Sequence, residues 1–342
     1  MSGGPRTAAN SFLSGSSQDR PALAATLMVC SLFGLGFQDA LVKFAADTIS
    51  LWQFQFLRAA FNLTFLLILA KIIWGTSAVP RPVRLWAVVM RSCFLVGAMI
   101  CFFGGIAFLN LANIAAGLYT FPLFVALFSA LFLGEKVGIQ RSTAILAGFA
   151  GTLLILRPGA DDFSLVNLTP VGAGLCYAGT VLTTRKFCRE ESPATLAYGA
   201  ALAFILAGIL GLAVFSLEPF PQLAQDWPYL FTGWRGLTWQ IFLIIVACSA
   251  INLCANMCLS KAYQTAEVSW LAPFDYTYLI FAGFWGYMLW DQIPDLFSVI
   301  GMMLIAGSGV FVAWRERKLK GPKSGRFKQR WQALARILFD PI

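Results

Sequence analysis

Long apolar segments separated by short polar loops fill most of this chain. Ten of them approach the roughly 20 residues that a helix needs to cross a bilayer. They cover residues 22–44, 51–74, 84–108, 112–133, 139–157, 169–187, 194–215, 238–260, 267–290 and 296–314. A lipid-exposed backbone must satisfy its own hydrogen bonds, and the segments lack the period-two alternation of β-barrel strands. The pattern therefore predicts an all-α polytopic membrane protein.

Positive charges in the loops predict how these spans are oriented, because cytoplasmic loops carry an excess of Lys and Arg. With a cytoplasmic N-terminus, the inner face receives Arg6, Arg20, Lys71, Arg81, Arg84, Lys136, Arg141, Arg185, Lys186, Arg189 and Lys261. The outer face receives only Lys43, Arg157 and Arg235. We therefore predict ten transmembrane helices with both termini in the cytoplasm, in the inner (plasma) membrane of the cell.

The two ends of the chain differ from the apolar middle. Residues 1–21 are polar and rich in Ser and Gly, which predicts a disordered cytoplasmic tail. Residues 317–342 are basic, and one helical face of this tail carries Phe327, Trp331, Leu334 and Leu338. This pattern predicts an amphipathic helix on the anionic inner leaflet of the bilayer. The alternative is a solvated basic tail.

Composition narrows the possible functions. The chain is 58% hydrophobic and 12% charged, whereas a soluble domain carries about 25% charged residues. The net charge of +9 does not indicate nucleic-acid binding, because the Lys and Arg residues lie mainly in loops and in the C-terminal tail. The sequence has no histidine, and none of its eight cysteines forms a C-x-x-C motif. We therefore expect no metal, no cofactor and no imidazole chemistry.

Two stretches of the chain resemble each other. Residues 120–159 and 276–316 each hold a long apolar span, an acidic loop and a second span that contains glycine. Glu135 matches Asp291 and Gly151 matches Gly307, both at an offset of 156 residues. Each half then has five spans, so the second half enters the membrane inverted relative to the first. Inverted repeats of this kind are typical of transporters, whose sites lie between the halves near the membrane midplane.

The run PLFVALFSALFLGEKV at residues 122–137, with a weaker copy at 276–293, resembles the EamA-type transporters of the drug/metabolite transporter superfamily. The resemblance covers residues 22–316 and gives two repeats, 22–158 and 169–316. It implies a central cavity lined by helices 1–4 and 6–9, alternating access, and small organic substrates. In one departure, Tyr278 stands where the second copy would match Pro122, and the proline comes earlier, at Pro273.

Polar side chains inside the spans mark candidate functional positions, because a charge at the bilayer centre costs about 2.5–3.5 kcal/mol on insertion scales. Polar stripes at helical spacing occur in two spans: Gln55, Arg58 and Asn62 in the second, and Ser249, Asn252 and Asn256 in the eighth. A water-filled cavity and interhelical hydrogen bonding both account for such stripes.

Three further charged residues lie within the predicted spans. Asp39 and Lys43 are spaced i, i+4 near the outer end of the first span, where they can pair with each other. The competing prediction pairs Asp39 with Arg58, and either pair could be an outer gate or a structural bridge. Arg91 lies about 10 Å inside the third span, at 1.5 Å per residue. It could bind an anionic substrate group or extend toward the interface.

Asp275 is the most informative of these residues. It lies about 12 Å inside the ninth span, so its short side chain cannot reach the interface. Pro273 removes a backbone donor beside it, and broken helices at membrane depth often bind substrate. At the offset of 156, Asp275 matches Tyr119, so we predict that the two face each other across one cavity. The alternative role is a protonated acid that only hydrogen-bonds a neighbouring helix.

Mid-span aromatic residues complete the predicted pocket: Tyr119, Phe121, Tyr177, Trp270 and Tyr276. The predicted function is secondary transport of a small organic metabolite, such as an amino acid or a nucleoside-like or amphiphilic solute, with proton coupling or exchange left open. The alternatives are a lipid flippase of the same fold and a lipid-modifying enzyme. The enzyme is less favoured because this chain has no histidine and no acidic cluster at a membrane edge. Predicted partners are the solute, the bilayer and a second copy of the chain in a homodimer.

Overall fold

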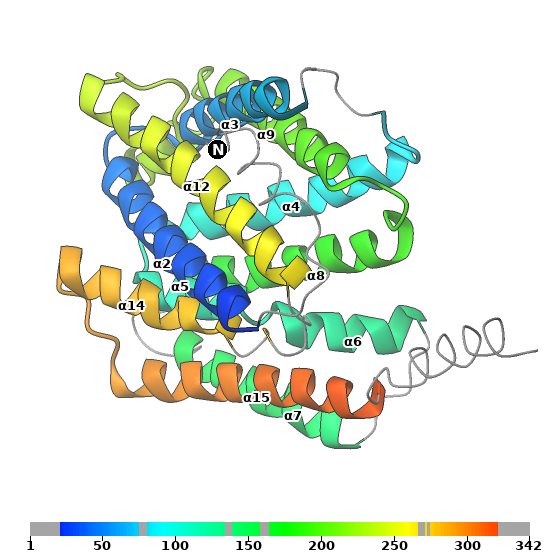
Figure 1. The fold of residues 1–342 in the computed structure, drawn as a ribbon. Coiled ribbons are helices and arrows are strands. Elements are labelled where there is room, and N and C mark those ends of the chain that lie inside the picture. The colour runs from blue at the N-terminus through cyan, green and yellow to red at the C-terminus, as the bar shows by residue number, and fades with distance from the viewer. Residues whose placement is uncertain are drawn as a thin grey trace, which may run out of the picture.

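The computed structural model describes residues 21–74, 81–133, 139–157, 164–265, 271 and 274–320, and the regular elements in these ranges are all helices (Figure 1). The long helices are α2 (Pro21–Ala46), α3 (Leu51–Trp74), α4 (Leu85–Ile106), α7 (Ile139–Leu156), α8 (Thr169–Phe187), α9 (Pro193–Phe215), α12 (Trp239–Thr265) and α15 (Leu296–Lys320). The broken or short ones are α5 (Leu111–Leu118), α6 (Phe121–Leu133), η1 (Leu165–Leu168), α10 (Pro221–Asp226), α11 (Pro228–Phe231) and α14 (Thr277–Trp290).

The long helices begin and end within a few residues of the predicted spans, because Pro, Gly and polar loop residues bound each apolar run. Six apolar stretches in the described part of the chain are long enough to cross a membrane: Ala22–Ala46, Leu51–Ile68, Leu85–Ile106, Leu111–Phe128, Ala194–Phe215 and Trp239–Tyr263. Shorter apolar stretches occur in α7 and α15. Ten crossings and cytoplasmic termini remain predictions, and the predicted tail helix at 326–338 lies outside the described residues.

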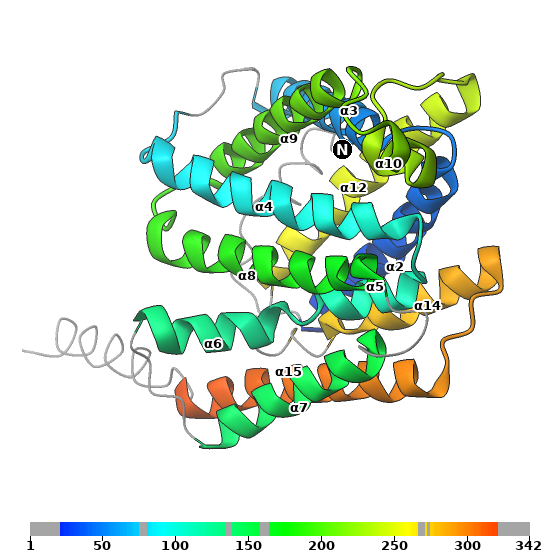
Figure 2. The same ribbon diagram turned by 180° about the vertical axis from the view of Figure 1, so that it is seen from behind.

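Helix packing follows the two-repeat arrangement. The first helix of the first repeat, α2, packs along α12 and α14 of the second repeat. Its counterpart α8 packs along α4, α5 and α6 of the first repeat (Figures 1 and 2). Likewise α3 contacts α9 and α12, while α9 contacts α3 and α4. The most extensive helix contacts therefore join the two halves, and the centre of the molecule lies between them.

The helices α7 and α15 form a separate pair at one edge of the molecule (Figure 2). They approach most closely at Gly151 and Gly301, where a Cβ on Gly151 would lie 2.7 Å from the Gly301 carbonyl oxygen. Any side chain there would force the helices apart. The two helices are therefore in close contact at these two glycines.

The predicted span 112–133 is not one helix. The helix α5 ends at Leu118 and α6 begins at Phe121, with a turn between them. Pro122 has no N–H to donate to the Leu118 carbonyl, so the regular ladder of hydrogen bonds is interrupted there. The Thr120 hydroxyl compensates by donating to the Gly117 carbonyl at 2.6 Å. The predicted apolar span is present, but a turn divides it into two helices, because one proline overrides the helical pattern.

A second break lies at the matching place in the second repeat. Phe274 and Asp275 are helical, Tyr276 forms a turn, and α14 begins at Thr277. The Thr277 hydroxyl donates to the Phe274 carbonyl at 2.7 Å. At the offset of 156, the turn at Tyr119 matches Asp275. The residues beside the two breaks, Tyr119 and Asp275, therefore meet between the two halves.

Candidate functional site

The two breaks meet at a direct contact between Tyr119 and Asp275. The Tyr119 hydroxyl donates to the Asp275 backbone carbonyl at 2.9 Å and lies 3.4 Å from the carboxylate Oδ1. Tyr119 is buried and Asp275 half-buried. The two residues that the offset of 156 matches therefore contact each other directly, while the cavity between them stays a prediction. A phenolic donor from one repeat holds an acid from the other.

Aromatic side chains surround this contact. The Tyr119 ring centroid lies 5.3 Å from that of Tyr276 and 6.1 Å from that of Phe121, which in turn packs edge-on against Tyr177 at 4.9 Å. We call Tyr119, Phe121, Tyr177, Tyr263, Asp275 and Tyr276 the Asp275 cluster. Tyr177 and Tyr263 lie within electrostatic reach of the Asp275 carboxylate. The sequence predicted every member except Tyr263, which sits near the end of α12 without a repeat match.

Arg91 of α4 borders the cluster on the side of Tyr177, whose hydroxyl lies within its electrostatic reach. Its guanidinium donates from Nε to the Thr184 hydroxyl at 3.0 Å and from Nη1 to the Leu196 carbonyl at 3.4 Å. Arg91 thus joins α4 to α8 and α9. Its guanidinium therefore binds polar partners inside the bundle. This differs from extension toward the interface, which was one of its two predicted roles.

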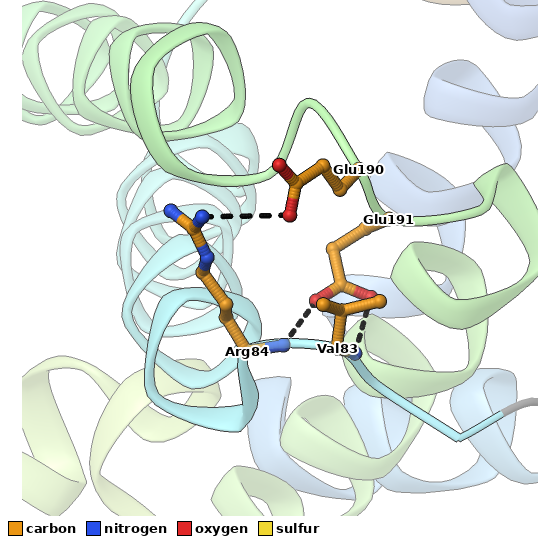
Figure 3. A network of polar contacts seen from close by, with 4 residues as sticks. All are labelled: Val83, Arg84, Glu190 and Glu191. Carbon is orange, nitrogen blue, oxygen red and sulfur yellow. Dashed lines mark hydrogen bonds and ion pairs between the residues drawn. The ribbon is translucent and has the colours of Figure 1, made fainter.

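The N-terminal end of α4 is fixed by two acids from the loop between α8 and α9 (Figure 3). Glu191 accepts hydrogen bonds from the backbone N–H groups of Val83 at 3.1 Å and Arg84 at 2.6 Å. The exposed Arg84 side chain pairs with Glu190 at 3.4 Å. A carboxylate at a helix N-terminus satisfies free amides and complements the helix dipole. The two repeats are thereby tied together at the predicted inner face.

Asp39 of α2 pairs with neither of its predicted partners. Its Oδ2 accepts a short hydrogen bond from the Tyr278 hydroxyl of α14, and its Oδ1 accepts from Gln38 Nε2 at 3.2 Å. Among the described residues, no Lys or Arg nitrogen comes within ion-pair distance of Asp39. Both predicted ion pairs were wrong, because the Tyr278 hydroxyl hydrogen-bonds the Asp39 carboxylate instead. The sequence analysis singled out Tyr278 only because it stands where a proline was expected.

Lys43 instead closes the C-terminal end of α4. Its ammonium group donates to the carbonyls of Ile106 at 2.9 Å and Leu109 at 2.6 Å. These carbonyls lack helical partners, and a cation beside them complements the helix dipole. The charge that the sequence assigned to a pair with Asp39 is therefore used at a helix end.

Arg58 is buried in an aromatic cage. Its guanidinium carbon lies 5.3 Å from the Phe54 ring centroid, 4.8 Å from that of Phe103 and 5.7 Å from that of Phe204. Its Nη2 donates to Gln55 Oε1 at 3.0 Å. Cation–π contacts of this kind stabilise a desolvated guanidinium by about 2 kcal/mol. The predicted neighbours Gln55 and Arg58 thus interact with each other within one helix.

Tyr229 of α11 lies within electrostatic reach of Arg58. Its ring is buried, and its hydroxyl has no hydrogen-bond partner among the described residues. Burial raises the pKa of Tyr229 well above its ordinary value, so the phenol stays neutral beside Arg58. No pattern in the sequence singles out Tyr229, because it lies in a short helix between spans.

The two polar stripes contact each other. Asn62 Nδ2 lies 3.4 Å from Asn252 Oδ1, and the Ser249 hydroxyl lies 3.3 Å from the Arg58 carbonyl. These bonds join α3 to α12, as the interhelical alternative predicts. Asn256 is exposed and donates to the Asn252 carbonyl at 2.8 Å within its own helix. Trp270 and Pro273 lie outside the described residues.

A small internal cavity lies elsewhere, between α5, α7, α8 and α15. Its volume is about 60 Å³, and its lining includes Asn113, Gly117, Thr152, Asn167 and Ile305. Asn113 Oδ1 is buried and unpartnered among the described residues. This space has the size of one or two water molecules. It is too small for an organic solute and contains none of the predicted site residues.

Comparison with known proteins identifies the class. The model of the EamA-like transporter family matches residues 22–157 and 165–314. The chain is 26% identical over 82% of its length to the pseudopaline exporter CntI of Pseudomonas aeruginosa, covering 92% of that protein. It is 22% identical over 86% of its length to the S-adenosylmethionine uptake transporter of Rickettsia bellii, covering 94% of it.

A further relative is the riboflavin transporter of Vibrio cholerae, 32% identical over 59% of this chain and 62% of that protein, which is less than two thirds of its length. A solved crystal structure shares the fold, with a TM-score of 0.57 and 17% identity over 87% of this chain and 99% of the other. The chain belongs to the EamA-like transporter family. It is a multi-pass plasma-membrane transporter of the drug/metabolite superfamily and not an enzyme.

Proposed function

We propose that this protein is a secondary transporter that moves a small organic solute by alternating access and binds it at the Asp275 cluster. The observation that carries the proposal is the hydrogen bond from Tyr119 to Asp275, which joins two broken helices of opposite repeats. Discontinuous helices at the interface of inverted repeats form the substrate sites of many transporters. A solute held there contacts both halves at once, so its binding can favour one arrangement of the halves over the other.

The chemistry of the cluster favours a flat ring that carries hydrogen-bond donors or a cationic group. Tyrosine faces attract rings and cations, while the Asp275 carboxylate accepts hydrogen bonds. Arg91, bordering the cluster, can supply a positive charge to a carboxylate elsewhere on the solute. Riboflavin and S-adenosylmethionine, which the names of two relatives give as their solutes, each contain a flat heteroaromatic ring. We extend this solute class to the present chain as part of the proposal.

Binding of riboflavin and S-adenosylmethionine to purified protein tests the proposal. We expect either solute to raise the melting temperature, and riboflavin fluorescence to be quenched by the tyrosine rings. Asp275→Asn should weaken binding roughly 10- to 100-fold, since a hydrogen bond to a charged group contributes about 1.5–3 kcal/mol. In proteoliposomes the same variant should lose uptake.

Asp291→Asn is the matched control, because it makes the same change in an exposed acid at the C-terminal end of α14. It should bind and transport like the wild type. Equal binding by Asp275→Asn and the wild type would place the solute elsewhere in the protein. An absence of binding by both solutes to the wild type would reject this solute class.

A further inference from the structure

A second buried acid, Asp39, stands outside the proposed solute site. It is 6% exposed, and its carboxylate is held by two neutral donors, the Tyr278 hydroxyl and the Gln38 amide. An acid fixed in an ion pair stays ionised, whereas an acid bonded to neutral donors can gain or lose a proton without leaving a cation unpaired. Asp39 therefore has the surroundings of an exchangeable site.

The groups facing Asp39 act on its charge in opposite directions. They are Tyr278 from α14, Arg58 from α3, Cys248 from α12 and Gln38 from its own helix. Burial opposes ionisation, while the two donors and the nearby charge of Arg58 favour it. Arg58 is held back by its aromatic cage and by Gln55, and Lys43 is bound to the end of α4. Neither cation is therefore free to lock the carboxylate in one state.

Unpartnered polar atoms occur on Gln38, which bonds Asp39, and on Arg58 and two of its neighbours. Gln38 Oε1, Gln55 Nε2, Arg58 Nε and the Tyr229 hydroxyl are buried and have no hydrogen-bond partner among the described residues. Buried atoms of this kind are normally satisfied by water in proteins. Water at these atoms would give protons a path to the carboxylate.

A pair of stacked rings links Asp39 to the solute site. The Tyr278 hydroxyl binds Asp39, and the Tyr278 ring stacks on Tyr119 with centroids 5.5 Å apart and an interplanar angle of 21°. The Tyr119 hydroxyl in turn binds Asp275. We call Tyr119 and Tyr278 the tyrosine stack. A shift of Tyr278 when Asp39 changes charge would move the ring against which Tyr119 is positioned.

We propose that Asp39 is a reversible proton-binding site and that the tyrosine stack couples its protonation to the Asp275 cluster, so that proton movement is linked to solute movement. This inference rests on the proposed function of the cluster. A hydronium ion at one face gives its proton to the Asp39 carboxylate, so that one O–H bond breaks in hydronium and one forms on Asp39. At the other face the Asp39 O–H bond breaks and the proton forms an O–H bond with water.

Infrared difference spectroscopy of the protein in liposomes tests the proton site without any solute. We expect a carboxylic-acid C=O band that grows reversibly on acidification, persists in Asp275→Asn and is lost in Asp39→Asn. Asp47→Asn, an exposed acid just beyond the same helix, is the matched control and should keep the band. If the wild-type band survives in Asp39→Asn, or disappears in Asp275→Asn instead, the assignment to Asp39 is overturned.

A second variant covers the case in which Asp39→Asn does not fold. Asp39→Glu keeps a carboxyl group but moves it by one methylene, so its band should persist at a changed frequency and titrate at a changed pH. A band identical to that of the wild type would show that it arises from another residue and overturn the proposal.

The coupling has its own readout, the pH at which the Asp39 band titrates. Tyr278→Phe removes a direct donor, and Tyr119→Phe perturbs the stack without touching Asp39, so both should change this pH. Tyr287→Phe makes the same change at an exposed residue of α14 outside both the tyrosine stack and the Asp275 cluster, and it should leave the pH unchanged. An unchanged pH in Tyr119→Phe would overturn the coupling. Because no solute is present, these results stand even if riboflavin and S-adenosylmethionine bind nowhere.

Discussion

The two broken helices have similar backbone breaks but carry different side chains beside them. Each turns at the same place in its repeat, and each is bridged by a threonine hydroxyl three residues after its acceptor, Thr120 onto Gly117 and Thr277 onto Phe274. The matched residues beside these turns are Tyr119 in the first repeat and Asp275 in the second. One supplies a donor and the other an acceptor.

This difference shows what repeat symmetry does and does not specify. A duplicated fold places matching residues opposite each other across the pseudo-two-fold. Two identical acids at that point would repel each other, and two tyrosines would leave no charge to bind a solute. The unlike pair avoids both outcomes. The symmetry therefore positions the site, and the departure from symmetry gives it a charge.

Exchanging the two residues tests this comparison with the largest expected effect. Tyr119→Asp should place a second carboxylate against Asp275, and an uncompensated buried charge costs about 3–5 kcal/mol. The melting temperature of this variant should fall sharply. The double variant Tyr119→Asp/Asp275→Tyr restores one donor and one acceptor and should recover much of the loss.

Thermal unfolding in one detergent compares the wild type, both single variants and the double variant. A double variant no more stable than Tyr119→Asp would show that the surroundings, rather than the pairing, determine which residue each repeat carries. Additive effects of the two changes would contradict a direct interaction between the positions.

The pairing of Tyr119 with Asp275 could be predicted because it depends on register alone. The offset of 156 residues is readable in the sequence, and the inverted repeat converts it into proximity. The boundaries of the long helices were also readable, since apolar runs end at polar loops and at Pro or Gly. Phe121, Tyr177 and Tyr276 were predicted beside Tyr119 on a different ground, their position in the middle of apolar spans.

The partners of the charged residues could not be read in this way. Asp39 accepts a hydrogen bond from Tyr278 and pairs with neither Lys43 nor Arg58. The sequence favoured Lys43 because of its i, i+4 spacing, and Arg58 because it lies in the same outer half of the bilayer. The rotation of each helix and the free carbonyls at the end of α4 determine which partners these side chains bind. Neither can be predicted from the local sequence pattern. The aromatic cage of Arg58 depends on side chains from three different helices, α3, α4 and α9.

Packing beside the first break gives the next largest expected effect. A Cβ on Gly117 would collide with the backbone of Pro170 at the start of α8. Gly117→Ala should therefore destabilise the protein by about 1–3 kcal/mol, the usual cost of overpacking. In the second broken helix, a Cβ on Gly283 would meet Ala112 at an ordinary 3.9 Å. Gly283→Ala is thus the matched control and should have little effect on the melting temperature.

Thermal unfolding of these two alanine variants shows whether the first break is the tighter one. Equal destabilisation by both would mean that α8 yields at Pro170 and that the two breaks are packed alike. A loss confined to Gly283→Ala would reverse the comparison.

The bridging threonines give the smallest expected effect and the finest comparison. Thr120 is fully buried, whereas Thr277 is half-buried. Replacing either by valine keeps the shape but removes one hydrogen bond, which contributes about 0.5–1.5 kcal/mol. Thr120→Val should fall at the upper end of that range, because the Gly117 carbonyl loses its hydroxyl partner far from solvent. Thr277→Val should fall at the lower end, because solvent can reach the freed Phe274 carbonyl. Matched melts of the two variants measure the difference, and a larger loss in Thr277→Val would show that the second break, beside Asp275, depends more on its bridge than the first.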